Sequence, residues 1–204
     1  LRLDATDRPH VAYAEEATVK YAYKDHLGWH TEVVDAHYSE NLSLALDSNG
    51  RPHVSYYFAA GYDLMYAYKD HLGWHAEIVD GEEGWVGRYS SLALDADDRS
   101  HISYEGDGDL KYAHKDLGGW HVEVVAAEGD AGLFTSIALD GEGAPWISHL
   151  EWTGQTLNVV RLVAGSWESQ LVDHAAVVGM NSSAVMDAGG TLHVSYVQQD
   201  EWTS

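Results

Sequence analysis

An internal repeat of 43 to 48 residues constrains the fold of this chain more than any other feature of its sequence. The motif Ser-Leu-Ala-Leu-Asp at 43–47 returns in related form at 91–95, 136–140 and 183–187, and the chain begins inside the same motif. Its aspartates are Asp4, Asp47, Asp95, Asp140 and Asp187, followed six residues later by His10, His53, His101, Trp146 and His193. A tryptophan follows in four copies, at Trp29, Trp74, Trp120 and Trp167. The repeat therefore governs the whole chain.

Each repeat holds four short runs of β-branched and aromatic residues separated by turn residues, as in 43–46, 53–57, 64–69 and 74–79. These runs predict four strands, the first two joined by a hairpin turn at Asp47–Gly50. Four strands every 43 to 48 residues are typical of one blade of a β-propeller. We therefore predict an all-β protein, a β-propeller of four-stranded antiparallel blades.

The order of strands within a blade follows from side-chain size. Ala45, Ala93 and Ala138 lie in the middle of the first strands, where inner strands converge, whereas the fourth strand alternates apolar and polar residues as an outer edge would. We expect one propeller domain or fragment over 1–204, with blades at about 1–36, 42–80, 90–126, 135–173 and an incomplete 182–204. A half-built fifth blade predicts self-association or a larger parent chain.

Composition excludes several classes of partner. Thirty-three acidic against eleven basic residues give a net charge of −22, which repels nucleic acid and anionic membranes. No apolar run has the length of a membrane span, and the opening residues 1–4 lack the pattern of a signal peptide, so we expect a soluble piece of a larger protein without membrane insertion. The absence of cysteine excludes disulfides and thiolate chemistry. The acidic balance, the five lysines and the absence of cysteine suit an extracellular or high-salt setting, and we expect an extracellular or cell-surface location.

The repeated histidines and tryptophans have structural and functional interpretations. Histidines at equivalent positions of rotated blades lie far apart, so we favour hydrogen bonds within each blade, to carboxylates like Asp47 or hydroxyls like Ser55, over a shared metal ion. We favour inter-blade packing of the tryptophans over sugar platforms. The pairs His30/Glu32, His75/Glu77 and His121/Glu123 are expected to be solvated edge residues that blunt strand pairing.

No motif for catalysis, phosphate binding or an EF-hand is present. The acidic segments 95–98 and 105–109 could offer oxygens to Ca²⁺, but both fall where a turn is expected and lack a ligand-rich loop. We therefore expect no metal, no cofactor and no catalytic residue.

The connections between strands differ in how much they vary among the copies. The first-to-second and third-to-fourth turns are nearly constant, whereas the second-to-third loops and the connections between repeats are individual. Both variable sets emerge on one face of a propeller, and individual loops on a rigid scaffold usually carry binding sites. The candidate ligand-binding residues on this face are Tyr38, Tyr62, Trp85, Arg88, Phe134, Glu151 and Trp152. Rings beside charged groups suit sugar recognition, although they could equally cover the loop bases or the channel mouth.

The units at 43–57, 63–70 and 73–80 resemble the repeats of secreted or surface β-propeller proteins of bacteria and archaea, of the sialidase-like and NHL-like kind, and more weakly those of fucose-binding propeller lectins. The resemblance implies a repeat style and a secreted or surface protein, and it carries no site residues over to this chain.

Our first functional hypothesis is a non-catalytic binding or adhesion module of an extracellular protein, with carbohydrate or another cell-surface ligand as its partner. The alternative is a propeller glycoside hydrolase or polysaccharide lyase, for which Glu82, Glu83, His37 and His174 would be the acid-base candidates. A purely structural repeat scaffold is the third hypothesis.

Overall fold

The computed structural model describes residues 1–81, 84–174 and 177–199, in which five antiparallel sheets follow one another along the chain. The first sheet contains β1 (Arg2–Leu3), β2 (Pro9–Glu15), β3 (Thr18–Asp25) and β4 (Gly28–Asp35). The second contains β5 (Ser39–Leu46), β6 (Pro52–Phe58), β7 (Asp63–Asp70) and β8 (Gly73–Asp80). The third contains β9 (Val86–Leu94), β10 (Ser100–Gly106), β11 (Asp109–Asp116) and β12 (Gly119–Ala126). The fourth contains β13 (Leu133–Leu139), β14 (Pro145–Glu151), β15 (Thr156–Val163) and β16 (Ser166–Asp173), and β17 (Val177–Met186) pairs with β18 (Leu192–Gln199).

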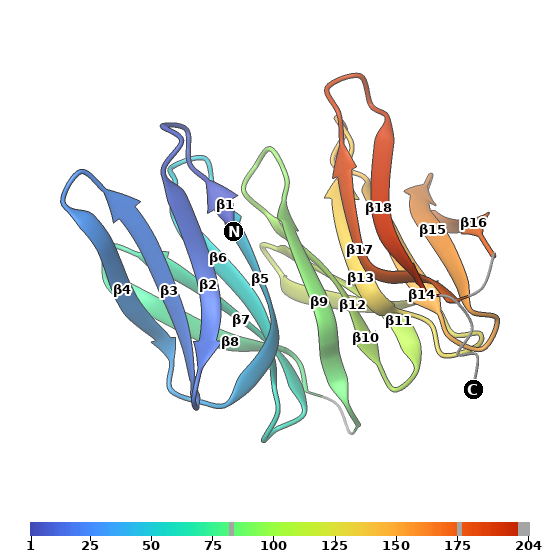
Figure 1. Ribbon diagram of the computed structural model, residues 1–204, viewed down its shortest axis with the longest axis horizontal. Coiled ribbons are helices and arrows are strands. Elements are labelled where there is room, and N and C mark those ends of the chain that lie inside the picture. The colour runs from blue at the N-terminus through green and yellow to red at the C-terminus, as the bar shows by residue number, and fades with distance from the viewer. Residues whose placement is uncertain (82–83, 175–176, 200–204) are drawn as a thin grey trace.

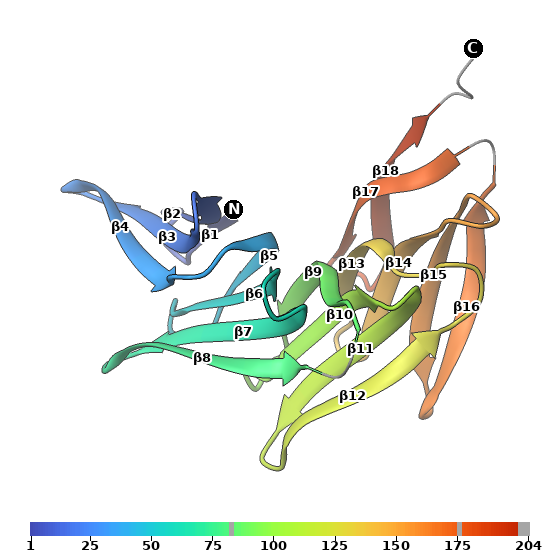
Figure 2. The same ribbon diagram turned by 90° about the horizontal axis from the view of Figure 1, so that it is seen from below.

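The sheets are arranged as an arc, with neighbouring sheets packed face to face (Figure 2). The first strands β5, β9 and β13 lie on the inside of the arc, and the fourth strands β4, β8, β12 and β16 lie on the outside (Figure 2). This is the order that the small alanines of the first strands predicted. The first and last sheets stand at opposite ends of the arc (Figure 1).

The connections between strands form two sets, which lie at opposite ends of the strands. The first-to-second turns lie at the upper edge of the arc in Figure 1, while the second-to-third loops and the connections between sheets lie at its lower edge. We call this lower edge the variable face. Among the described residues, no helix has the length and apolar content needed to cross a bilayer.

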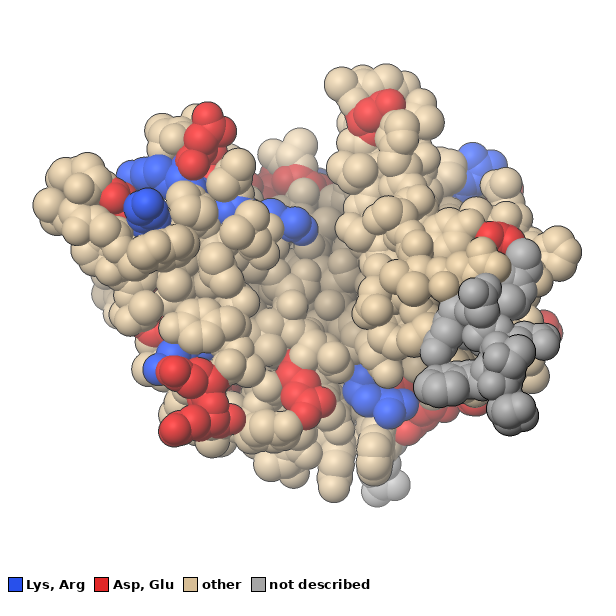
Figure 3. All heavy atoms as spheres, in the orientation of Figure 1, with Lys and Arg blue, Asp and Glu red and all other residues tan. Residues whose placement is uncertain are grey.

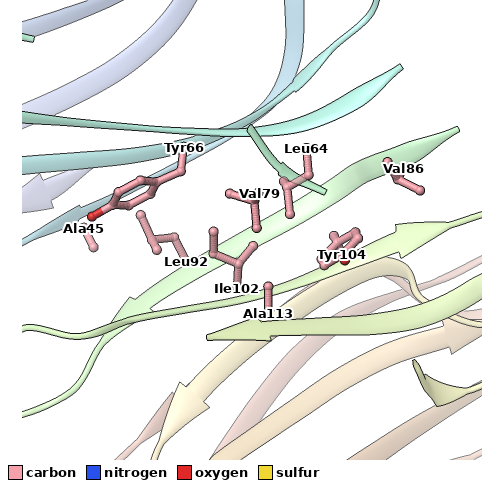
Figure 4. Close-up of a cluster of buried hydrophobic side chains, with 9 residues drawn as sticks. All are labelled: Ala45, Leu64, Tyr66, Val79, Val86, Leu92, Ile102, Tyr104 and Ala113. Carbon is pink, nitrogen blue, oxygen red and sulfur yellow. The ribbon is translucent and has the colours of Figure 1, made fainter. Parts of the chain in front are cut away.

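The core consists of separate apolar clusters between successive sheets. Between the second and third sheets, Leu64, Leu92 and Ile102 are almost fully buried, with Tyr66 and Tyr104 beside them (Figure 4). Equivalent clusters lie between the first and second sheets and between the third and fourth. Each sheet therefore buries its faces against its neighbours.

In the second to fifth sheets, the first strand begins earlier than the repeat pattern indicated, at Ser39, Val86, Leu133 and Val177. A β-bulge breaks the two-residue alternation in these strands, with left-handed backbone at Asn41, Tyr89, Phe134 and Asn181. Because the bulge interrupts the alternation of apolar and polar residues, the sequence pattern did not indicate where each of these strands begins. Segments that we expected to be loops, including Arg88 and Phe134, are therefore strand residues.

The repeated histidines lie in hydrogen-bonded groups within their own sheets, as expected. His53 Nδ1 is hydrogen-bonded to the hydroxyl of Tyr66 on the adjacent strand, and its Nε2 lies 3.8 Å from Asp47. His101 has the same partners in Tyr112 and Asp95. The tyrosine was not predicted. Within the described residues, no group of three or more potential ligands is placed to hold a metal ion.

Trp74, Trp120 and Trp167 pack between sheets, as expected, whereas Trp29 of the first sheet is 55% exposed. Two of the neighbouring glutamates do more than line a solvated edge. Trp74 meets the ring of Tyr21 from the preceding sheet edge-on, and its indole N–H donates to Glu32 at 2.9 Å. Glu32 also accepts from the ammonium of Lys69 at 2.6 Å. Glu77 has the same roles toward Trp120 and Lys115 in the next pair of sheets. Our interpretation of Glu32 and Glu77 as solvated edge residues was wrong, because each one binds the following sheet.

Candidate ligand-binding site

A pocket of about 620 Å³ opens on the variable face where the third and fourth sheets meet. Loops and bulged first strands both contribute to it. Its lining residues are Trp85, Arg88, Tyr89, Glu105, Asp107, Gly108, Asp130, Ala131, Leu133, Phe134, Trp152 and Met180. Its volume lies within the range of small-molecule sites.

Two exposed indoles border this pocket. Trp85 is 53% exposed and Trp152 is 48% exposed, although both side chains are large and apolar. Tyr62 stacks on Trp85 with ring centroids 5.3 Å apart and planes 8° from parallel. The guanidinium of Arg88 lies 5.6 Å from the centroid of the Trp85 ring. Trp85 thus contacts both a ring and a cation while remaining open to solvent.

Backbone contacts fix the two loops that carry the indoles. The N–H of Trp85 donates to Asp107 Oδ1 at 2.8 Å, which ties the connection before β9 to the loop after β10. The N–H of Trp152 donates to the carbonyl of Asp130 at 3.2 Å in the same way one sheet later. The tryptophans are therefore positioned by the scaffold before any ligand arrives.

The bulges place two further rings in the pocket. Tyr89 and Phe134 occupy the equivalent left-handed bulge positions of β9 and β13, and their ring centroids lie 4.6 Å apart. The other two bulge positions hold Asn41 and Asn181. The aromatic floor of the pocket therefore arises from differences among the copies at one repeat position.

The charges of the pocket are unequal. Arg88 Nε donates to the buried Glu105 at 2.6 Å, and this hydrogen bond raises the pKa of the guanidinium. Glu105 also accepts from the N–H of Gly108 at 2.8 Å. Arg88, the single cation among the described lining residues, is thus paired, while Asp107 and Asp130 add two further carboxylates. Basic side chains are few on the view in Figure 3, and most lie beside acidic ones.

The structure brings together most of the ring and cation candidates predicted from the sequence. Trp85, Arg88, Phe134 and Trp152 line the pocket, and Tyr62 adjoins it through Trp85. Tyr38 lies outside the lining, where its hydroxyl donates to Glu40.

Glu151 also lies outside this lining, and its carboxylate accepts from the N–H groups of Thr153 and Gly154. Four further lining residues were not predicted as binding residues from the sequence: Tyr89, Glu105, Asp107 and Asp130. The acidic segment 105–109 was a visible signal for two of them.

Of the four acid-base candidates of the enzyme hypothesis, the structure describes only the two histidines, and these have different partners. Glu82 and Glu83 lie outside the described residues. His37 is hydrogen-bonded to Asp35 at 2.5 Å and packs edge-on against Phe58. The backbone N–H of His174 donates to Asp173 at 2.7 Å.

Comparison with known proteins identifies the fold. No family model and no curated protein sequence matches this chain. Among solved structures, the intramolecular trans-sialidase from Ruminococcus gnavus has a TM-score of 0.58 at 16% identity, over 91% of this chain and 47% of that chain. An ulvan lyase has a TM-score of 0.58 at 14% identity, over 90% of this chain and 59% of that chain. The endo-arabinase from Bacteroides thetaiotaomicron has a TM-score of 0.55 at 13% identity, over 96% of this chain and 89% of that chain.

The fold is a β-propeller. Its four four-stranded sheets are complete blades, and β17 with β18 forms half of a fifth, as predicted. The chain spans about half the length of the trans-sialidase, and identities of 13 to 16% show a shared fold alone.

Proposed function

We propose that this propeller is a non-catalytic carbohydrate-binding module of an extracellular protein, and that the pocket between blades 3 and 4 holds the sugar. The observation that carries the proposal is the pair of exposed indoles, Trp85 and Trp152, at the rim of a pocket built on a rigid scaffold. An indole face packs against the C–H groups of a sugar ring, while nearby carboxylates accept hydrogen bonds from its hydroxyls.

The charge of the lining favours a neutral glycan. Arg88 is paired with Glu105, so no unpaired guanidinium is offered to an acidic sugar by the described lining, and Asp107 and Asp130 would repel a carboxylate. The similarity in fold to proteins named trans-sialidase, ulvan lyase and endo-arabinase supports a carbohydrate ligand in general terms.

A glycan array followed by calorimetry tests this function. We expect a neutral glycan to bind, and we expect Trp85→Ala and Trp152→Ala each to weaken binding at least about tenfold. Tyr38→Ala is the matched control, because Tyr38 is 51% exposed but lies outside the pocket. Absence of binding to every glycan would favour the scaffold hypothesis, and an equal loss in Tyr38→Ala would remove the assignment to this pocket.

A glycoside hydrolase or polysaccharide lyase is the second candidate. It is favoured by one observation, the presence of Glu105, Asp107 and Asp130 in a single pocket. Chromatography of polysaccharides incubated with the protein would detect released oligosaccharides. Product formation that is lost in Asp107→Asn or Asp130→Asn would replace the binding proposal with the enzyme.

A further inference from the structure

A tyrosine-to-aspartate bridge recurs between neighbouring blades. In each case a tyrosine from the second strand of one blade donates to an aspartate that ends the fourth strand of the preceding blade. The bridges are Tyr56 to Asp35 at 2.6 Å, Tyr104 to Asp80 at 2.7 Å and Tyr196 to Asp173 at 2.6 Å. The repeat thus closes the rim of these three interfaces with one hydrogen bond, which is buried for Tyr104, partly buried for Tyr56 and exposed for Tyr196.

The interface between blades 3 and 4 lacks this bridge. His149 stands at the tyrosine position, and Ala126 stands at the aspartate position. A third position also differs. In the preceding interface the ammonium of Lys111 lies 3.2 Å from Asp80, and the residue equivalent to Lys111 in blade 4 is Asn158. Every replacement is shorter than the group it replaces. A pocket of about 540 Å³ opens there, lined by Ala126, His149 and Asn158 among others.

The imidazole of His149 is buried and only half paired. His149 is 2% exposed, and its Nδ1 accepts a hydrogen bond from the N–H of Gly132 at 3.3 Å. Burial lowers the pKa of His149 to about 4, so the ring is neutral near pH 7 and Nε2 carries the hydrogen. Among the described residues Nε2–H has no acceptor. The equivalent tyrosines reach the aspartate at the end of the preceding fourth strand, and His149 lines the same pocket as Ala126, the residue that stands at that end in blade 3.

The other lining groups are polar and acidic. Glu128 and Glu151 supply carboxylates, and Thr153, Thr156 and Ser169 supply hydroxyls. Glu151 is held in place by the N–H groups of Thr153 and Gly154, both at 2.8 Å. No lysine, arginine, tryptophan, tyrosine or phenylalanine belongs to the described lining. This chemistry differs from that of the aromatic pocket described above.

We propose that the pocket between Ala126 and His149 is a second ligand site, which binds a small hydroxylated compound carrying a primary ammonium group. The ammonium is bound by the carboxylates of Glu128 and Glu151, and a ligand oxygen accepts from His149 Nε2–H. A net charge of −22 raises the local concentration of cations at such a site. The acidic lining disfavours anions. Because His149 Nε2–H lacks an acceptor among the described residues, a ligand with an oxygen beside Nε2 is favoured.

The test compares the binding of D-glucosamine and D-glucose at pH 6.5. Binding is measured by calorimetry and by the imidazole ¹⁵N and ¹H resonances of His149. We expect glucosamine to shift these resonances and to bind at least tenfold more tightly than glucose. The double variant A126D/H149Y restores the bridge that the other interfaces use, so it fills the pocket with side chains compatible with the fold. We expect it to lose glucosamine binding, and Glu128→Gln, an exposed substitution, to weaken binding at least threefold.

Trp85→Ala separates this site from the aromatic pocket. Unchanged glucosamine binding in Trp85→Ala supports a second site, whereas loss in Trp85→Ala with retention in A126D/H149Y would overturn it. An unperturbed His149 resonance would also overturn the proposal and leave an ordered water as the partner of Nε2–H. Equal affinities for glucose and glucosamine would overturn the ammonium selectivity.

Discussion

The aspartate that ends each first strand has several partners at once. Oδ1 of Asp47 accepts from the N–H groups of Asn49 at 2.9 Å and Arg51 at 2.7 Å, and Oδ2 accepts from Arg51 Nε at 2.5 Å. His53 lies beyond them on the next strand. One carboxylate therefore closes the turn and lies beside the histidine, which is consistent with the constant six-residue interval between Asp and His.

Removal of this carboxylate should destabilise the fold. Burial alone would raise the pKa of Asp47, but hydrogen bonds from Arg51 and Asn49 hold it below its ordinary value. We expect Asp47→Ala to lower the free energy of unfolding by about 2 to 3 kcal/mol. Asp47→Asn should lose less, because an amide oxygen can still accept from the turn. Urea denaturation measures both changes.

The same variants have an expected pH dependence. A carboxyl whose folded pKa is depressed contributes stability above its unfolded pKa, and this contribution is lost as pH falls through the folded value. The advantage of the native chain over Asp47→Asn should therefore shrink below about pH 4. Asp97→Ala, which removes an exposed ion pair with Arg99, is the control and should cost less than about 1 kcal/mol. An equal loss from Asp97→Ala would contradict the role given to Asp47.

His149 should make stability depend on pH over a different range. Its folded pKa of about 4 lies below the ordinary value near 6.5, so the unfolded chain takes up a proton first as pH falls. Stability is therefore lost progressively between about pH 6.5 and pH 4. Relative to His149→Gln, the native chain should lose roughly 2 to 3 kcal/mol between pH 7 and pH 4.5. Urea denaturation of both proteins at both pH values measures this difference. Equal changes in their free energies of unfolding would contradict the prediction.

At the scale of elements, the inner strands are linked by serines of the repeated motif. Ser43 Oγ accepts from the N–H of Leu92 at 3.0 Å, and Ser91 and Ser136 accept in the same way from Ile137 and Ala184. The hydroxyl of one blade therefore satisfies a backbone donor of the next blade. This is a physical reason for the serine at the beginning of these three copies of the motif.

Ser43→Ala should cost about 1 to 3 kcal/mol, because it leaves the N–H of Leu92 without an acceptor. Ser183→Ala is a matched control. Ser183 has the same repeat position but accepts no such bond from the described residues, so its substitution should be nearly neutral. Thermal unfolding of the two variants measures the difference, and similar melting temperatures would contradict the inter-blade role of Ser43.

Sequence periodicity predicted the elements that repeat and failed where a copy departs from the repeat. Strand number, blade order and the packing of Trp74 followed from period and side-chain size. The bulge at Tyr89 could not be predicted, because a left-handed residue inside a strand disrupts the alternation that reveals strands. Glu32 was misjudged because its partners Lys69 and Trp74 belong to the next blade, a contact that depends on how blades stack.

The candidate site was predictable to a similar extent. Trp85 and Trp152 stood out because aromatic residues in divergent loops break the pattern. Glu105 did not, since its ion pair with Arg88 joins two strands whose register shifts at that point. Tyr38 resembled the other candidates in sequence but lies in a different inter-blade segment.

At the scale of the whole molecule, the packing of one tryptophan edge-on against the preceding blade recurs along the arc, which indicates what an unpaired end of the arc would bind. Trp74, Trp120 and Trp167 each pack edge-on against a ring of the preceding blade. Trp29 has the same position in the first blade and is 55% exposed. At the other end, β18 pairs only with β17 among the described residues, which leaves an open strand edge.

We expect the 204-residue chain to self-associate through these ends. Burial of an exposed indole and pairing of an open edge both favour contact between copies, and blades share one packing geometry. Sedimentation velocity should show a mass above that of the monomer that rises with protein concentration. Trp29→Ala should shift the distribution toward monomer, whereas Leu27→Ala, at an exposed hairpin tip of the same blade, should not. A protein that stays monomeric at every concentration would contradict association, and an equal effect of both variants would remove Trp29 from the interface.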